Sequence, residues 1–324
     1  MAFLKHINIK AKTDSNTGFG TNANNYGGRF VNKNGKPNVQ KRGLSFFDHI
    51  SWYHTLIDMP IWKFLLILVS FYAIINFIFA LLYYAIGTEN LNGVDYSASA
   101  WVQFGQAYFF STQTYTTVGY GSISPSGFLA SALSSVEALI GLLSFAIATG
   151  LLFGRFSKPT AFLKFSNNAL IAPYRDTTAL MIRTVPFKNT NFTDAEAKIT
   201  LGMRVEEDGK MANKFYQLEL EMEKINALTL NWTLVHPITE KSPLYQLTKE
   251  DFEKLDGEIL VYIKTFDDMF STTVSARSSY TFDEVIYGAK FELMYSENED
   301  KTKTVLHLDK LDSIYKVELN ETKS

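Results

Sequence analysis

Six consecutive residues near the middle of the chain, TTVGYG at positions 116–121, carry little reactive side-chain chemistry. Their useful groups are main-chain carbonyl oxygens, together with the Thr117 hydroxyl. When successive carbonyls face one axis, such oxygens can replace the water molecules that a monovalent cation loses on dehydration. Gly119 and Gly121 permit that arrangement, because glycine adopts backbone angles that other residues avoid. The run therefore predicts stacked rings of oxygen ligands, with the valine and tyrosine side chains pointing away and packing behind the loop.

The sequence around this run carries almost no charge. Positions 64–154 contain no Lys or Arg and only three acids. Residues 1–63 carry nine basic and three acidic side chains, and residues 155–324 carry twenty-two and twenty-seven. A soluble surface needs charges of both signs, so a long block without one cation predicts a membrane domain.

Two segments of this block, residues 62–88 and 127–155, are long and apolar enough to cross a bilayer, which takes about 20 helical residues. Basic residues precede the first span and follow the second, with none between them. The positive-inside rule therefore predicts a multi-pass protein of the cell (inner) membrane, with both termini cytoplasmic. The aromatic residues expected at the membrane surfaces are Trp62, Tyr83, Tyr84, Trp101 and Tyr108.

The connection between the spans contains another apolar segment, residues 101–114, which is too short to cross. We expect a re-entrant pore helix here, followed by the loop 117–121. Non-helical backbone survives at membrane depth only where it lines a watery path or is buried in protein. In a soluble protein the same letters would predict a turn in a β-segment, but the two spans and the missing cations favour a pore. A closed ring of such loops needs four chains, so we expect a homotetramer.

The rest of the chain differs in character. Residues 1–45 are expected to form a flexible cytoplasmic N-terminus. Residues 46–57 place apolar side chains at helical spacing, which predicts an amphipathic helix on the inner membrane surface, with an ordinary domain helix as the alternative. The transmembrane pore domain is expected at 58–157. Residues 158–324 show short alternating runs between turn signals, which predict a cytoplasmic β-sandwich domain.

No pattern in the sequence predicts catalysis. The chain has no cysteine, and its five histidines are scattered without ligand spacing. Ser, His and Asp occur without a nucleophile motif, so we do not expect an enzyme. The net charge of −2 gives no indication of nucleic-acid binding.

Nearly the whole chain resembles the inward-rectifier potassium channel family, and within it the prokaryotic branch. The resemblance is carried by TTVGYG at 116–121, RFVNKNG at 29–35, GRFSKP at 154–159, KFSNNALI at 164–171, SPLY at 242–245 and ARSSY at 276–280. It implies a membrane α plus cytoplasmic β architecture, in which a two-transmembrane-helix pore with a re-entrant pore helix precedes an immunoglobulin-like β-sandwich. It also implies a potassium-selective channel, gated at the inner helix crossing and modulated by membrane lipids, with K+ as the permeant ion and no cofactor.

The resemblance assigns expectations to single residues. The filter residues that would bind K+ are Thr117, Val118, Gly119, Tyr120 and Gly121. Phe153 falls where prokaryotic relatives place an aromatic gate, although an apolar residue on a membrane helix can simply face lipid. Phe145 falls at the pore-cavity position where strong rectifiers carry an acid. A phenyl ring cannot attract multivalent blockers, so strong rectification through this position is not expected.

Filter support is expected from Glu137, the ionisable group inside a span, and at Gln113. Gln113 and Ile123 stand where relatives carry an acid–base pair, and the joint replacement leaves no unpaired charge. Gly141 and Gly150 are interpreted either as hinges or as close-packing sites.

Two further sets belong to the cytoplasmic side. Asp194 and Asp268 align with an acidic ring of the cytoplasmic pore, and solvated surface acids are the equal alternative. The candidates for contacts with lipid headgroups, anionic ones included, are Lys63, Arg155, Lys158 and Lys164, which positive-inside topology explains equally well. Two other functions stay open, a membrane-anchored adaptor with a silent pore and a non-selective cation channel.

Overall fold

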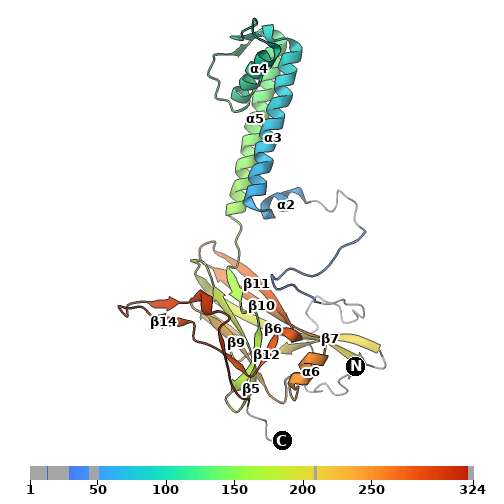
Figure 1. The fold of residues 1–324 in the computed structure, drawn as a ribbon, viewed down its shortest axis with the longest axis vertical. Helices are drawn as coiled ribbons and strands as arrows, with labels where there is room; N and C mark the ends of the chain where they lie inside the picture. The colour runs from blue at the N-terminus through green and yellow to red at the C-terminus, as the bar shows by residue number, and fades with distance from the viewer. Residues whose placement is uncertain (1–12, 14–28, 44–50, 208–209, 320–324) are drawn as a thin grey trace. The chain divides into compact units, whose positions relative to one another are not determined.

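The computed structural model describes the whole chain except residues 1–12, 14–28, 44–50, 208–209 and 320–324 (Figure 1). The chain divides into two compact units. Residues 42–158 form one of them, here called the pore unit. Residues 1–41 and 159–324 form the other, here called the β unit.

Four helices make up the described part of the pore unit. They are α2 (Trp52–Asp58), α3 (Ile61–Ile86), α4 (Ala100–Tyr115) and α5 (Gly127–Phe156). At about 1.5 Å per residue, α3 and α5 exceed the ~30 Å of a bilayer core, and both are apolar enough to cross it. The short helix α4 packs between them at one end (Figure 1).

Small elements connect the helices of the pore unit. Pro60 precedes the first turn of α3, where its missing N–H group costs no helical hydrogen bond. A 3-10 turn (Thr88–Asn90) follows α3, and strand β1 (Leu91–Asn92) then pairs with β2 (Ser124–Pro125) just before α5. This pairing joins the start and the end of the segment that carries α4 and the loop after it.

The amphipathic helix is predicted at 46–57, whereas α2 runs from Trp52 to Asp58. Residues 46–50 lie outside the described residues. Within α2 no side chain is buried, and Trp52 and Tyr53 are exposed.

The β unit contains two five-stranded sheets. The first has the order β11-β10-β6-β7, with β8 also paired to β6, and the second has the order β12-β4-β5-β3, with β9 also paired to β5. The strands of the first are β6 (Phe192–Glu207), β7 (Lys210–Leu218), β8 (Lys224–Ala227), β10 (Gly257–Asp267) and β11 (Thr272–Thr281). Those of the second are β3 (Leu163–Phe165), β4 (Ala169–Tyr174), β5 (Thr177–Pro186), β9 (Trp232–Ile238) and β12 (Val285–Tyr287).

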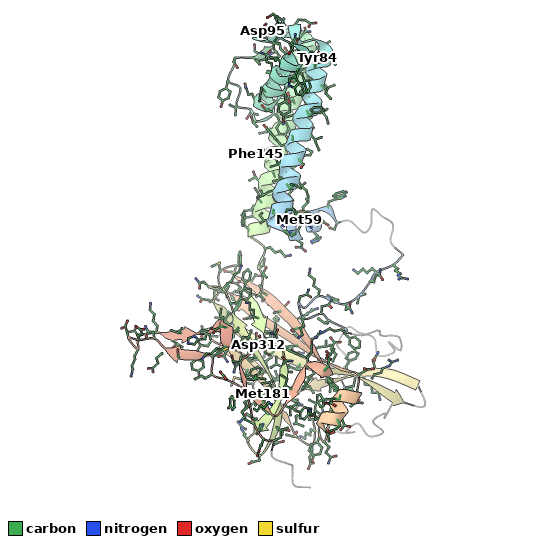
Figure 2. All side chains as sticks on the ribbon, viewed as in Figure 1. Met59, Tyr84, Asp95, Phe145, Met181 and Asp312 are labelled. Carbon is green, nitrogen blue, oxygen red and sulfur yellow. The ribbon has the colours of Figure 1, made fainter. Side chains whose placement is uncertain are left out.

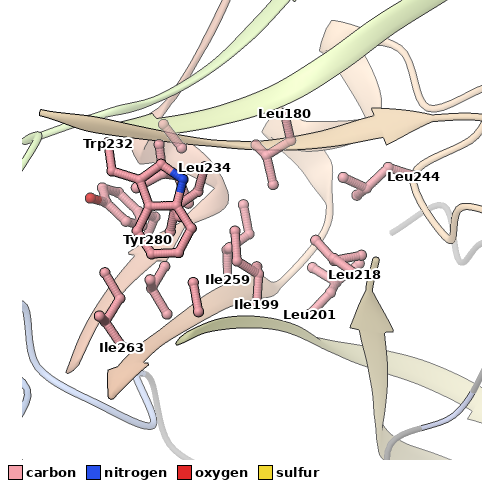
Figure 3. Packing of buried hydrophobic residues seen from close by; sticks show 14 of the residues in the cluster. Leu180, Ile199, Leu201, Leu218, Trp232, Leu234, Leu244, Ile259, Ile263 and Tyr280 are labelled. Carbon is pink, nitrogen blue, oxygen red and sulfur yellow. The ribbon is translucent and has the colours of Figure 1, made fainter. Parts of the chain in front are cut away.

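The two sheets face each other across one apolar core (Figure 3). Leu180 of β5 and Leu234 of β9 lie opposite Ile199 of β6 and Ile259 of β10, and all four are fully buried. Alternate residues of a strand point to opposite faces, so each strand needs an apolar residue only at every second position. The predicted architecture, two apolar helices followed by a β-sandwich domain, is confirmed.

A C-terminal extension leaves the sandwich as two short ribbons. They pair β13 (Ala289–Phe291) with β16 (Ile314–Lys316), and β14 (Tyr295–Glu297) with β15 (Thr304–Leu306). The buried Arg183 of β5 holds this extension, because its Nη2 donates to the Glu292 carbonyl at 2.7 Å and its guanidinium lies 4.4 Å from the Phe291 ring centre. Burial lowers the pKa of Arg183 to about 10.

Part of the segment predicted to be flexible, 1–45, is instead bound to the sandwich. The backbone N–H groups of Phe30 and Val31 both donate to the buried Glu258 carboxylate, and Arg29 pairs with Glu284 at 2.5 Å. The side chains of Phe30 and Val31 are 6% exposed. Residues 29–38 are therefore ordered, because they satisfy a carboxylate that burial would otherwise leave without donors. That burial still raises the pKa of Glu258.

Candidate ion-conduction site

The backbone of the loop after α4 alternates in handedness. Thr117, Gly119 and Gly121 have φ angles of +59°, +54° and +80°, whereas the residues between them are not left-handed. A β-branched residue with positive φ is unusual, since the left-handed conformation costs roughly 1–2 kcal/mol per residue. Strain of this kind persists only where the surrounding structure imposes it, and it is common at functional sites.

The N–H groups of this loop turn back towards α4. Thr117 N–H donates to the Thr114 carbonyl at 3.0 Å, and the N–H groups of Val118 and Gly119 donate to the Gln113 carbonyl at 3.0 and 3.3 Å. When successive N–H groups gather on one side, the carbonyls lie on the other. Among the described residues, none donates a hydrogen bond to the carbonyls of residues 117–121. The loop thus presents a row of unpaired oxygens, which is a ligand set suited to a cation.

The two larger side chains of the loop have no cover within one chain. Val118 is 53% exposed and Tyr120 is 79% exposed. The expected packing behind the loop is therefore not made inside a single copy.

A buried polar network joins three helices next to this loop. The Glu137 carboxylate of α5 accepts hydrogen bonds from Tyr83 Oη of α3, at 2.7 Å, and from Ser111 Oγ of α4. Ser111 Oγ lies 3.1 Å from Asn76 Oδ1 of α3. Glu137, Ser111, Asn76 and Tyr83 are fully buried. A buried carboxylate needs such donors, and here it fixes the pore helix between the two spans.

Tyr83 corrects one sequence expectation. It is predicted as an aromatic residue of the membrane surface, but it is fully buried and donates a hydrogen bond to Glu137. Its neighbour Tyr84 and the residues Trp62 and Trp101 are exposed. In the sequence, the signals for the network are Glu137 and Asn76, polar residues within the two apolar spans.

Gln113 and Ile123, the two positions where relatives carry an acid–base pair, make contacts that involve no charged group. Gln113 acts through its main-chain carbonyl, which accepts from the loop. Ile123 packs against an apolar cluster that includes Phe79, Leu91 and Phe110.

Gly141 is a close-packing site in the structure. A Cβ atom at this position would lie 1.9 Å from the Tyr115 carbonyl oxygen, so the C-terminal end of α4 rests directly on α5. At Gly150 an added Cβ would meet nothing within 4 Å of the same chain. The two glycines that the sequence leaves equivalent therefore have different surroundings.

Phe145 and Phe153 project from the lower half of α5 (Figure 2 labels Phe145). Their side chains are 74% and 72% exposed. They are eight residues apart, which is about 12 Å of helical rise. Exposed phenyl rings at two levels suit a pore that is lined by apolar constrictions.

In the β unit, the two predicted pore acids lie close together. Thr193, which precedes Asp194, donates from Oγ1 to Asp268 Oδ1 at 3.1 Å. Both acids are exposed, and Asp194 has a φ of +47°. The fully buried Asp267, which no sequence pattern indicated, accepts the Met269 N–H at 2.9 Å and shapes the same turn.

Arg155 of the basic group is engaged by main-chain oxygens. Its guanidinium donates to the carbonyls of Leu56, Ile57 and Met59, at 2.5, 2.8 and 2.6 Å, and so completes the C-terminal end of α2. Its neighbour Lys158 pairs with Asp58. Lys63 is exposed beside Trp62. Of the three basic candidates in the pore unit, Lys63 alone has a side chain that makes no ion pair or hydrogen bond with a described residue.

The fourth basic candidate, Lys164, belongs to a cluster in the β unit. Its Nζ lies 5.1 Å from the Phe187 ring centre, and Lys188 Nζ lies 4.0 Å from the Phe162 ring centre. The two rings pack edge to face, 5.7 Å apart. Lys188 is a second exposed cation at this edge that the sequence did not indicate, because β3 and β5 bring it there by pairing.

Two apolar helices around a short helix, with an oxygen-lined loop and a β-sandwich in the same chain, define a two-helix ion channel with a large accessory domain. Comparisons with known proteins agree. A family model described as an ion channel matches residues 64–158. A second, described as the inward rectifier potassium channel C-terminal domain, matches residues 163–324. The chain belongs to the inward rectifier potassium channel family.

Individual relatives extend over most of the chain. The inward rectifier potassium channel Kirbac3.1 of Paramagnetospirillum magnetotacticum is 32% identical, covering 81% of this chain and 88% of its own. The ATP-sensitive inward rectifier potassium channel 12 of Gallus gallus is 26% identical over 85% of this chain and 69% of its own. The G protein-activated inward rectifier potassium channel 4 of Mus musculus is 27% identical, covering 81% and 67%. The protein is thus a membrane-spanning inward rectifier potassium channel, not an enzyme, and potassium is its permeant ion.

Proposed function

We propose that four copies of this chain assemble around a fourfold axis and conduct K+ through a filter formed by Thr117 to Gly121. The observation that carries the proposal is the alternating backbone of residues 117–121, with its N–H groups tied to α4 and its carbonyls unpaired. A single row of oxygens cannot surround an ion, whereas four rows can replace its water shell. The exposed Val118 and Tyr120 favour the same assembly, since a neighbouring copy would cover them.

The other parts of the pore take roles in this assembly. Four Phe153 rings form the gate at the inner helix crossing and close it by excluding water. Glu137 and Gln113 support the filter. Asp194 and Asp268 form a ring of acids that raises the local K+ concentration in the cytoplasmic pore.

We further propose that both termini are cytoplasmic in the cell (inner) membrane and that membrane lipids modulate the channel. Among the predicted candidates in the described pore unit, Lys63 is the one whose side chain is left for an anionic headgroup, since Arg155 and Lys158 already have partners. Arg155 is already bound to the end of α2, so its effect on lipid is indirect. The exposed Lys164 and Lys188 are the candidates in the β unit.

Rubidium uptake tests the function. The purified protein is reconstituted into liposomes with and without anionic lipid, and 86Rb+ uptake is measured against Na+ and in the presence of Ba2+. The proposal predicts uptake that prefers K+ and Rb+ over Na+, is blocked by Ba2+, and comes from particles of tetramer mass. Uptake without preference would favour a non-selective channel, and no uptake would favour the silent adaptor.

A gate variant sharpens the test. Phe153→Ala removes the phenyl constriction, so uptake should rise while the preference for K+ is kept. The matched variant Phe128→Ala changes another exposed phenyl at the opposite end of α5 and should leave uptake unchanged. If both variants behave alike, the gate lies elsewhere.

A further inference from the structure

The Ser111 hydroxyl of α4 is surrounded by more oxygen atoms than it can supply with hydrogen. Asn76 Oδ1 lies 3.1 Å from Ser111 Oγ, the Asn76 main-chain oxygen lies 3.2 Å from it, and Glu137 Oε1 lies closer still. A serine hydroxyl donates one hydrogen and can accept two. A single hydrogen cannot serve the amide oxygen of Asn76 and a carboxylate oxygen of Glu137 at the same time.

The orientation of the Asn76 amide is set by its own helix, α3. Its Nδ2 donates to the Tyr72 carbonyl at 2.7 Å. If the amide were turned over, Oδ1 would face that carbonyl oxygen, and no hydrogen would lie between the two oxygens. Asn76 therefore presents an acceptor to Ser111, and this amide cannot supply the missing hydrogen.

The surroundings of Glu137 favour a neutral acid. Its Oε2 receives the Tyr83 hydroxyl at 2.7 Å, and all four side chains of the network are fully buried, so water does not reach them within the chain. Positions 64–154 contain no Lys or Arg that could balance a negative charge. A carboxylate at membrane depth is costly without a cationic partner, whereas a carboxylic acid has no charge to balance and brings a hydrogen with it.

We propose that Glu137 is a protonated carboxylic acid in the folded channel, and that its hydrogen makes Asn76 a positioning residue of the filter. Glu137 Oε1–H donates to Ser111 Oγ, and the Ser111 hydroxyl in turn donates to Asn76 Oδ1. This reverses the hydrogen bond that an ionised Glu137 accepts from Ser111. Every hydrogen of the network then lies between a donor and an acceptor, and one continuous chain of bonds joins α5, α4 and α3.

This chain of bonds reaches the filter through α4. Ser111 lies two residues before Gln113, whose carbonyl accepts the N–H groups of Val118 and Gly119. A shift of Ser111 therefore moves the carbonyl that holds the loop. Asn76 acts on selectivity from the first span without touching an ion, a role that rests on the filter of the proposed function.

Infrared difference spectroscopy of the full-length protein at neutral pH tests the protonation. Carboxylic acids and carboxylates absorb at separate frequencies. Subtracting the spectrum of Glu137→Gln from that of native protein should reveal the band of a carboxylic acid. The matched variant Glu89→Gln, which changes an exposed acid of the same unit, should instead reveal carboxylate bands. Loss of carboxylate bands in Glu137→Gln overturns the inference.

Ser111→Ala tests the direction of the hydrogen bond and does not depend on the folding of Glu137→Gln. Alanine removes the oxygen that accepts the acid hydrogen, so the carboxylic-acid band of native protein should shift. An unshifted band belongs to another acid, such as the buried Glu258, and contradicts the proposed bond.

Uptake of 86Rb+ against Na+ tests the role of Asn76. Asn76→Leu removes the acceptor for the Ser111 hydroxyl, and the preference for K+ over Na+ should fall by about tenfold. The matched variant Ser70→Leu changes an exposed polar residue of the same helix and should keep the preference. Glu137→Gln should restore most of the preference that Glu137→Leu loses, because its amide donates to Ser111 and accepts from Tyr83.

The outcomes separate this inference from the proposed function. Native preference in Asn76→Leu, or equal losses in Glu137→Gln and Glu137→Leu, overturns the inference and leaves the selective channel standing. Absence of selective uptake by native protein overturns the proposed function and the role of Asn76 in it, whereas the infrared spectra still decide whether Glu137 carries a proton.

Discussion

The β unit and helix α5 of the pore unit bury opposite kinds of residue within one copy. The β unit places its large aliphatic side chains between two sheets and is complete within one copy. In the pore unit, the thirty residues of α5 bury only Ala130, Glu137 and Gly141 in the same chain, while its leucines and phenylalanines are exposed. Apolar surface is stable in lipid or against another copy, so the buried contacts of α5 within its own chain rely on small residues and a paired carboxylate instead. The sensitive positions should therefore differ between the units.

The largest effect is expected at the filter backbone. Gly119→Ala places a side chain on a residue with φ of +54°, at a cost of about 1–2 kcal/mol in each copy. The carbonyls should lose their common direction, and K+ preference in the uptake assay should be abolished. Gly105→Ala on α4 is the matched control, because an added Cβ meets nothing within 4 Å and selectivity should persist. Retained selectivity in Gly119→Ala would contradict the role of the loop.

The next largest effect is expected where a substitution adds side-chain volume inside the pore unit and so destabilises it. Gly141→Ala drives a methyl group into the Tyr115 carbonyl, so α4 or α5 must shift. Overpacking costs about 1–3 kcal/mol in ordinary cores, and a backbone obstacle gives less room to adapt. We expect far less folded protein after purification. Gly150→Ala should be neutral or up to about 1 kcal/mol more stable, because alanine is the better helix former. Similar losses in both variants would argue for two hinges.

Removing side-chain volume should destabilise the β unit more than the pore unit. Leu180→Ala in the sandwich core should reduce the stability of the β unit by about 2–5 kcal/mol, since it leaves a cavity. Leu143→Ala on α5 removes the same atoms from a side chain that is 54% exposed, and should change the stability of one chain little. Calorimetry of the full-length protein measures both. Equal losses of stability in the two variants would contradict the expected difference between the β unit and the pore unit.

The smallest effect concerns pH. His236 lies buried between the Glu219 carbonyl, at 2.6 Å, and Ser242 Oγ, at 2.8 Å, and burial lowers its pKa. The unfolded chain then binds more protons than the folded one as pH falls below the ordinary value of 6.5, so stability decreases on acidification. The slope from one such group is at most about 1.4 kcal/mol per pH unit. His236→Gln should reduce the change in melting temperature between pH 7 and pH 5. If the melting temperature of the variant depends on pH as steeply as that of the native protein, other groups cause the loss of stability.

Sequence predicted the parts of this molecule that depend on composition and local pattern. Hydropathy located the spans, and TTVGYG located the loop, because its glycines are required by local backbone geometry. Contacts between distant segments were not predictable. No pattern near Tyr83 in the sequence indicates that its hydroxyl donates to Glu137 and does not lie at the membrane surface. Likewise, no local pattern indicates that Arg29 and Phe30 bind the sandwich. The different surroundings of Gly141 and Gly150 likewise depend on where α4 ends in space.

The bond between Arg155 and α2 has a consequence for biosynthesis. The carbonyls of Leu56, Ile57 and Met59 leave the ribosome about a hundred residues before the guanidinium that donates hydrogen bonds to them. Until translation reaches that arginine, the end of α2 has only water or lipid headgroups as partners. The junction between α2 and the second span therefore cannot be completed before Arg155 has been synthesised, and a nascent protein truncated before residue 155 should leave the C-terminal end of α2 without this partner.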